Sequence, residues 1–238
     1  MPPIPKADTR NRLIRSMSEA DYALLAPHLT RQRVRKCQVL LDRDQPADRV
    51  WFPESGIASI ITTSPAGLSA ENGLIGRDGF VPVPIILGVD QGPQQAVMQV
   101  AGECQTVPVP AFLEALAASP GLNKLLLRYT QTLRMQTAFT ALSNAVHQID
   151  ERLARWLLMT HDRLDGTELP VTHEFLSTML GVRRPSVTTA LHMLEGGGLI
   201  RSERGCVLIR DRTALEDFAR DSYGVPEAEY ERLIGPLR

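Results

Sequence analysis

The sequence of 238 residues lacks features that define several other classes of protein. It contains no apolar run approaching the ~18–20 residues that a membrane-spanning helix needs, and no apolar segment typical of a secretion signal near its first residue. Its only cysteines are Cys37, Cys104 and Cys206. Because they are few and far apart, we expect neither a disulfide framework nor a paired-cysteine metal site. We therefore expect a cytoplasmic protein with no membrane partner.

The sequence also lacks an excess of charge of either sign. The 26 basic and 27 acidic residues leave a net charge of −1, which argues against nucleic-acid binding through bulk charge but not through a local basic patch. Residues 33–110 contain no histidine, and no G-x-S-x-G, P-loop or G-x-G-x-x-G motif occurs. We therefore predict neither an enzyme nor a metal site, and the cofactor stays unknown.

Short strands are predicted between residues 34 and 109, after a short helix capped by Ser18. Gly- and Pro-containing turns separate the β-rich segments, as is typical of an antiparallel sandwich or barrel. These segments are residues 39–41, 50–52, 57–62, 96–100 and 106–109. Arg31, Arg33 and Arg35 alternate and would share one strand face, for which a solvated face is favoured over a binding stripe.

A long helix is predicted for residues 121–146. No Pro or Gly occurs between Gly121 and Gly166, and apolar residues recur at helical spacing from Leu122 to Val146. A helix of this length, about 38 Å, extends beyond a small β domain, so a second copy of the chain is the expected partner. Packing on its own β domain is the alternative. The expected domains are residues 1–120, 121–146 and 147–238.

Residues 172–212 predict a helix-turn-helix followed by a β-hairpin. Thr172 can cap a first helix, Gly181 can end it, and Pro185 suits the first turn of a second helix. The buried face of the second helix is expected to hold Val187, Ala190, Leu191 and Leu194. Two apolar segments, residues 199–200 and 207–209, flank residues 202–205. We expect them to form a β-hairpin, which is the wing of a winged helix-turn-helix.

The polar residues of this region are suited to contact phosphates and base edges in a DNA major groove. The segment carries six arginines against four acidic residues, a modest local excess of +2. The predicted DNA-binding residues are Thr172, His173, Arg183, Arg184, Pro185, Ser186, Thr188, Thr189, His192, Arg201 and Arg204.

The order of β domain, long helix and the segment L-G-V-R-R-P-S-V-T-T-A-L-H-M-L-E-G-G-G-L-I resembles the CRP/FNR superfamily of bacterial transcription regulators. The resemblance implies an α+β chain with an N-terminal antiparallel β-roll of the cyclic-nucleotide-binding type, a dimerisation helix and a C-terminal winged helix-turn-helix. It implies a homodimer, paired through residues 121–146, that binds a palindromic site in double-stranded DNA, with RNA polymerase as a candidate partner. Arg184 matches the family's N-terminal arginine of the recognition helix, and Ser186 matches its phosphate-contacting hydroxyl.

The sequence departs from the family pattern at two sites, the recognition helix and the phosphate-binding segment of the β-roll. Pro185 and Thr189 stand where many members have a base-reading glutamate and arginine, so a different half-site is expected. Gln94 and Gln95 stand near the position of the Arg-Ser or Arg-Thr pair that binds the phosphate of a cyclic nucleotide. Without that cation we expect no useful affinity for cyclic AMP, and the ligand-binding residues stay unknown. The alternative is a dimeric ligand-binding or scaffold module with a vestigial helix-turn-helix.

Several smaller expectations complete the sequence analysis. Arg77 is expected to be an exposed turn arginine. Cys37 and Cys104 are expected to be small core residues of strands, and the histidines are expected at the surface or at helix caps. The final segment, residues 225–238, is expected to be peripheral.

Overall fold

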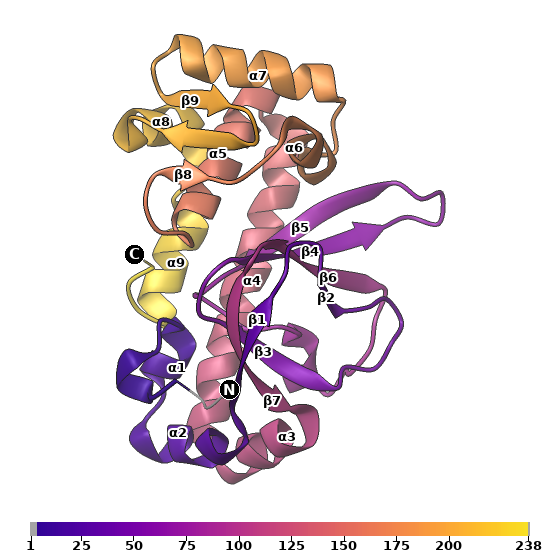
Figure 1. Cartoon of the computed structure of the whole chain (residues 1–238), viewed down its shortest axis with the longest axis vertical. Coiled ribbons are helices and arrows are strands. Elements are labelled where there is room, and N and C mark those ends of the chain that lie inside the picture. Colours follow the sequence, from indigo (N-terminus) through magenta and orange to yellow (C-terminus); the bar gives the residue numbers. More distant parts are fainter. Residues whose placement is uncertain (1–3, 238) are drawn as a thin grey trace.

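The computed structural model describes residues 4–237. The strands of the N-terminal half lie between groups of helices at the two ends of the molecule (Figure 1). The strands are β1 (Thr30–Val34), β2 (Val39–Leu41), β3 (Arg49–Pro53), β4 (Ile57–Thr63), β5 (Ser69–Ile75), β6 (Gln94–Val100), β7 (Gly102–Pro108), β8 (Glu168–Leu169), β9 (Ile200–Glu203) and β10 (Cys206–Ile209). The helices are α1 (Arg12–Ser16), α2 (Glu19–Leu25), α3 (Val109–Ala118), α4 (Pro120–Val146), α5 (Ile149–His161), α6 (His173–Leu180), α7 (Arg184–Gly196), α8 (Arg212–Ala219) and α9 (Val225–Leu233).

The N-terminal half contains two antiparallel sheets. One has the strand order β1-β7-β3 and the other has the order β2-β6-β4-β5, which confirms the predicted antiparallel architecture. Four aromatic rings pack together in the core of this half, with centroids 5.4 to 6.2 Å apart, the spacing at which tilted rings attract each other. These rings belong to Phe52, Phe80, Phe112 and Tyr129.

The elements of this half that were not predicted include β5, α3 and the short helix α1. Strand β5 (Ser69–Ile75) contains Glu71, Asn72 and Gly73, so it lacks the apolar alternation that marks a strand. Helix α3 (Val109–Ala118) begins directly after β7, where a strand was predicted to include Val109. Pro110 lies in the first turn of α3, where its missing N–H costs no hydrogen bond.

The long helix α4 passes from the β domain to the C-terminal half (Figure 1). One face of the helix, which includes Leu122, Tyr129 and Gln136, is buried against its own chain. This is the alternative packing, on the helix's own β domain. Gln136 receives a hydrogen bond from Leu74 N (2.7 Å) and donates one to Leu74 O (3.1 Å). Another side stays exposed in the single chain, with Leu142 48% and Val146 62% accessible.

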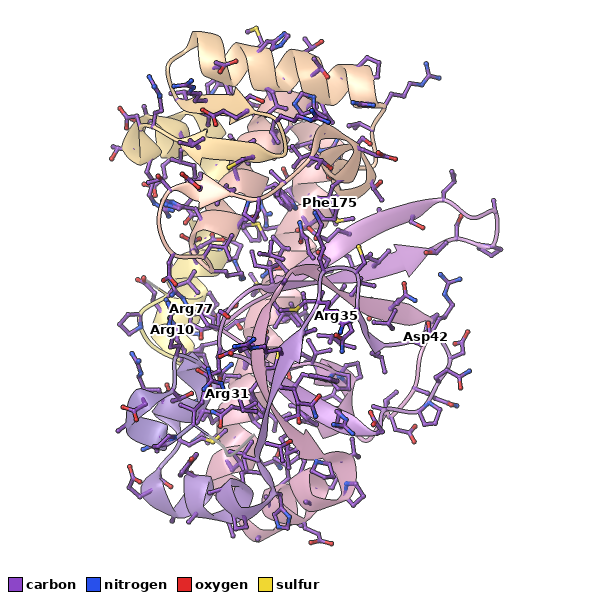
Figure 2. All side chains as sticks on the ribbon, in the orientation of Figure 1. Arg10, Arg31, Arg35, Asp42, Arg77 and Phe175 are labelled. Carbon is purple, nitrogen blue, oxygen red and sulfur yellow. The ribbon has the colours of Figure 1, made fainter. Side chains whose placement is uncertain are left out.

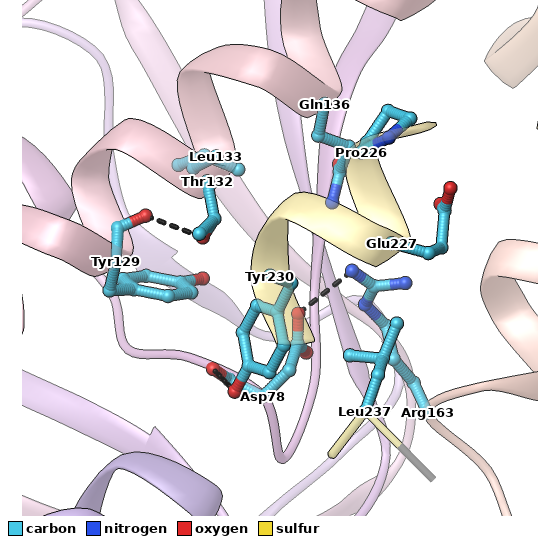
Figure 3. A pocket seen from close by; sticks show the side chains of 10 residues that line it. All are labelled: Asp78, Tyr129, Thr132, Leu133, Gln136, Arg163, Pro226, Glu227, Tyr230 and Leu237. Atoms are coloured by element: carbon cyan, nitrogen blue, oxygen red, sulfur yellow. Dashed lines mark hydrogen bonds and ion pairs between the residues drawn. The ribbon is translucent and has the colours of Figure 1, made fainter. Parts of the chain in front are cut away.

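The C-terminal segment is not peripheral, contrary to the prediction. Helix α9 packs against α4, and Tyr230 and Leu237 are both 4% exposed within the core of the N-terminal half. The Tyr230 hydroxyl donates to the backbone carbonyl of Asp78 at 2.8 Å (Figure 3). The acidic start of this segment, with Glu227, Glu229 and Glu231, suggested a peripheral position. Its few apolar side chains nevertheless complete the first core.

A buried ion pair joins the N-terminal half to the end of α5. Asp78 Oδ2 accepts from Arg163 Nη2 at 2.8 Å, and the two side chains are 2% and 4% exposed (Figure 3). Asp78 Oδ1 accepts from Gly76 N, and Arg163 Nη1 donates to Met159 O, both at 2.7 Å. Each charge thus has further hydrogen-bond partners, although Nε of Arg163 is buried without a partner among the described residues.

A second buried contact crosses from β5 to α5. Glu71 Oε1 accepts from Trp156 Nε1 at 2.8 Å, and both side chains are buried. Burial raises the pKa of Glu71 to about 7, in spite of the opposing hydrogen bonds from Ser59 and Trp156. Burial therefore shifts this side chain toward its neutral form, and near pH 7 the neutral and ionised forms are present in about equal amounts.

Two further expectations are corrected by the structure. Arg31 and Arg33 share one face of β1 as predicted and both pair with Glu103 of β7, with the Arg33 side chain 83% exposed, but Arg35 lies beyond the end of the strand. Cys37 is exposed in a turn at φ +64° rather than in a strand, whereas Cys104 is buried in β7 as expected.

The histidine expectation also fails at one position. His161 is only 4% exposed, at the end of α5, where Arg212 contacts its ring at 2.9 Å.

Among residues 4–237, no helix combines the length and apolar character needed to cross a bilayer.

We expect Glu71→Gln to change the pH dependence of stability. The folded pKa of about 7 exceeds the ordinary value of 4.5, so the contribution of Glu71 is complete below pH 4.5 and is lost as the pH rises through 7. Relative to the variant, the wild-type free energy of unfolding should fall over this range by at most about 3 kcal/mol. Urea unfolding at a series of pH values measures this difference. The exposed Glu114→Gln serves as control, and parallel curves for wild type and Glu71→Gln would contradict the assignment.

Candidate DNA-binding surface

The first helix of the predicted pair, α6, begins and ends where the sequence indicated. Thr172 Oγ1 accepts from Phe175 N at 3.2 Å, satisfying one of the free N–H groups of the first turn. Gly181 ends the helix at φ +63°, the left-handed region that favours glycine. Val182 N then donates to Ser177 O at 3.0 Å, and the Val182 side chain packs against the C-terminal core.

The second helix, α7, is anchored by its apolar face and lies along the outer end of the molecule (Figure 1). All four predicted core residues are buried, namely Val187, Ala190, Leu191 and Leu194. Arg183 is the N-cap residue, and Pro185 lies in the first turn. This packing leaves the opposite side of the helix and its N-terminus free to contact another molecule.

Most of the predicted DNA-binding residues of α7 lie on this free side. Arg183, Arg184, Pro185, Thr189 and His192 are exposed, whereas Ser186 and Thr188 are half-buried. Among the described residues, Arg183 and Arg184 form no ion pair with a carboxylate. Their guanidinium groups therefore remain available beside the N–H groups of the helix N-terminus, an arrangement that suits a phosphate or a base edge.

His173 connects three elements of the surface. Its Nδ1 lies 3.2 Å from Thr188 Oγ1 on α7, and its Nε2 lies 3.4 Å from Ser202 Oγ on β9. The imidazole and Thr188 thus hold α6, α7 and the hairpin together, which is a positioning role. Ser202 was not among the predicted residues, because nothing in its local sequence indicates this contact.

The hairpin follows α7 and joins β8 in a three-stranded antiparallel sheet with the order β8-β10-β9. Arg204 is exposed in its turn, beside Gly205 at φ +79°. Arg201 is also exposed but pairs with Glu203 at 3.0 Å, so a phosphate contact would have to compete with this pair. These two arginines belong to the hairpin rather than to α7.

The β domain contains an apolar pocket of about 300 Å³ beside strands β4 and β6. Ile60, Ile75 and Val81 line it, together with Gln94 and Gln95 at the predicted position. None of the described residues that line it is an arginine, lysine or histidine. A phosphodiester bound here would therefore have no cation to offset the loss of its hydration.

Arg77 does not reach this pocket, nor is it an exposed turn arginine as expected. Its side chain is 15% exposed, and Nη1 pairs with Asp165 at 2.7 Å on the turn that follows α5.

Within the part of the chain that the structure describes, no three His, Cys, Asp or Glu side chains are grouped so as to hold a metal ion.

The structure thus combines an antiparallel β domain, a long connecting helix and a helix-turn-helix followed by a β-hairpin. Residues 151–218 match the family model of the Crp-like helix-turn-helix domain. A comparison with curated protein sequences finds no match. The chain therefore carries a Crp-like helix-turn-helix domain between α5 and α8.

Solved structures of low sequence identity share the fold of most of the chain. FixK2 from Bradyrhizobium japonicum is 18% identical with a TM-score of 0.68, over 81% of this chain and 98% of that one. The c-di-GMP-responsive regulator CLP from Xanthomonas campestris is 18% identical with a TM-score of 0.64, over 81% and 99% of the two chains. A CRP/FNR-family transcriptional regulator from Thermus thermophilus is 19% identical with a TM-score of 0.61, over 80% and 98%. The predicted resemblance to the CRP/FNR superfamily is thus confirmed: this chain has the fold of its transcriptional regulators.

We expect Gly181→Ala to destabilise the protein by about 1–2 kcal/mol, because an alanine at φ +63° is strained even though its Cβ would meet no other atom within 4 Å. Gly197→Ala is the matched control, since Gly197 caps α7 at φ −77° and its added Cβ would make only ordinary contacts at 3.5 Å or more. Urea unfolding of the two variants measures the difference. Equal stability of the two variants would show that the left-handed turn is not required.

Proposed function

We propose that this protein is a sequence-specific, DNA-binding transcription regulator that acts as a homodimer on a palindromic operator. The observation that carries the proposal is the pair of exposed arginines, Arg183 and Arg184, at the start of an anchored helix α7 in a Crp-like domain. A helix fixed along one face and cationic at its N-terminus suits insertion into a major groove.

The predicted DNA-binding residues of α7 and the hairpin divide into two proposed roles. Arg183, Ser186, Arg201 and Arg204 contact phosphates and place the domain on the duplex. Arg184 and Thr189 read base edges, and Thr188 assists through its contact with His173. The half-burial of Thr188 favours Thr189 as the more direct reader of the two.

The exposed side of α4 supports the proposed dimer. Leu127, Leu142 and Val146 are 43%, 48% and 62% exposed, and their spacing places them on one side of the helix. Pairing two copies through residues 121–146 would cover them. It would also present two α7 helices to successive turns of the groove, about 34 Å apart.

The β domain is proposed to be a degenerate effector domain that does not bind cyclic AMP. The absence of a cationic residue among those lining its pocket supports this. RNA polymerase remains a candidate partner, and catalysis is no part of the proposal.

We expect the double substitution Arg183→Glu and Arg184→Glu to abolish DNA binding, because it reverses both charges at the N-terminus of α7. Fluorescence anisotropy with a labelled duplex measures the affinity. Arg43→Glu, an exposed arginine of the β domain, is the control and should bind as the wild type does. Unchanged binding by the double variant would favour the alternative, a dimeric ligand-binding or scaffold module with a vestigial helix-turn-helix.

Selection from random duplex DNA, read by sequencing, tests specificity and symmetry together. The wild type should enrich a two-fold symmetric motif. Thr189→Ala should enrich a changed half-site, at a cost of roughly 1–3 kcal/mol on the original site, with little loss of nonspecific affinity. A uniform loss on all sequences would instead make Thr189 a phosphate contact. An unenriched wild-type pool would contradict sequence-specific binding by the unliganded protein.

A further inference from the structure

Four arginines line one pocket at the junction of the N-terminal segment, the turn after β5 and the C-terminal segment. The pocket measures about 420 Å³, and its guanidinium groups come from Arg10, Arg12, Arg15 and Arg77. Arg10 and Arg77 lie side by side in Figure 2 and share one carboxylate partner, Asp165. Residues 234–236 form the remaining wall. The volume falls in the range of small-molecule sites.

The carboxylates nearby do not balance these four charges. Arg77 pairs with Asp165 at 2.7 Å, and Arg10 pairs with the other oxygen of the same carboxylate. These two hydrogen bonds lower the pKa of Asp165 to about 2, so it is fully ionised. Asp78, which attracts Arg12, is already paired with Arg163. Arg12 and Arg15 therefore lack a carboxylate partner among residues 4–237.

Arg12 is the least satisfied member of the group. Its Nη1 is buried and has no hydrogen-bond partner among the described residues, and the same is true of Nε of Arg77. Desolvation lowers the pKa of the Arg12 guanidinium from its ordinary value. A buried charged donor without a partner destabilises the fold, and the charge of a nearby anion would offset part of that cost by attracting these guanidinium groups.

We propose that this pocket binds a small molecule that carries a diphosphate or two separate phosphate groups. The arginines approach from different elements, and the tetrahedral oxygens of phosphate can accept hydrogen bonds from several directions, whereas a carboxylate accepts mainly in its own plane. More than one phosphate charge is needed because three positive charges remain after Asp165 is counted.

The site is separate from the proposed DNA-binding surface and does not depend on it. Helix α7 lies at one end of the molecule, and α1 and the end of α9 lie well away from it (Figure 1). Asp165, however, belongs to the segment that matches the Crp-like domain. A ligand in the pocket would touch only the N-terminal segment, Arg77 and residues 234–236, and it would compete with Asp165 for Arg10 and Arg77.

Calorimetric titration of the full-length protein with inorganic pyrophosphate, in phosphate-free buffer of low ionic strength, tests the proposal. We expect saturable binding at one site per chain. Arg12→Gln and Arg15→Gln should each weaken it by about tenfold or more, the loss of one charge-assisted hydrogen bond. Arg35→Gln is the control: it is an exposed arginine outside the pocket and should bind as the wild type does (Figure 2).

Absence of saturable binding overturns the proposal, and so does equal weakening by Arg35→Gln. Tighter binding of citrate than of pyrophosphate overturns the assignment to phosphate. Because Arg15 is exposed, its variant keeps the test decisive if Arg12→Gln fails to fold, which thermal unfolding of each variant reveals. DNA affinity is measured separately on the same preparations, so failure of one proposal is distinguishable from failure of the other.

Discussion

The arrangement of the two halves depends on the buried ion pair between Asp78 and Arg163. Asp78 lies in the turn that follows β5, and Arg163 lies just beyond α5, so the pair fixes the β domain against the start of the DNA-binding half. Tyr230 adds the C-terminal segment through the carbonyl of Asp78. Removing one charge of such a pair typically costs about 3–5 kcal/mol, because the other charge stays buried without its partner.

Some of the contacts around this pair are polar. Trp156 reaches Glu71, and Gln136 binds both backbone groups of Leu74. Such contacts require a defined geometry, since a polar group displaced slightly loses its partner while remaining desolvated. They act together with apolar packing, because Ile57 and Leu74 of the β domain are fully buried in the core of the C-terminal half.

The sequence was sufficient for the helix-turn-helix because each signal there is local. Thr172, Gly181 and Pro185 act within one or two turns of their own helices, and the apolar face of α7 repeats at helical spacing. The β domain was predicted in outline, but β5 and α3 were missed, because β5 lacks apolar alternation and α3 follows a strand without a break. The partners of Arg77, His161 and Tyr230 are distant in the sequence, so no local pattern could indicate them.

The packing of α9 has a consequence for the synthesis of the protein. Tyr230 and Leu237 belong to the core that also contains Leu13 and Phe52, although more than half of the chain separates them. Domains usually fold as units in the order in which they are made. Here the earliest part of the chain cannot close its core on the ribosome until residues 225–237 have emerged. The β domain must therefore wait, with part of its apolar surface uncovered, while the DNA-binding half is translated.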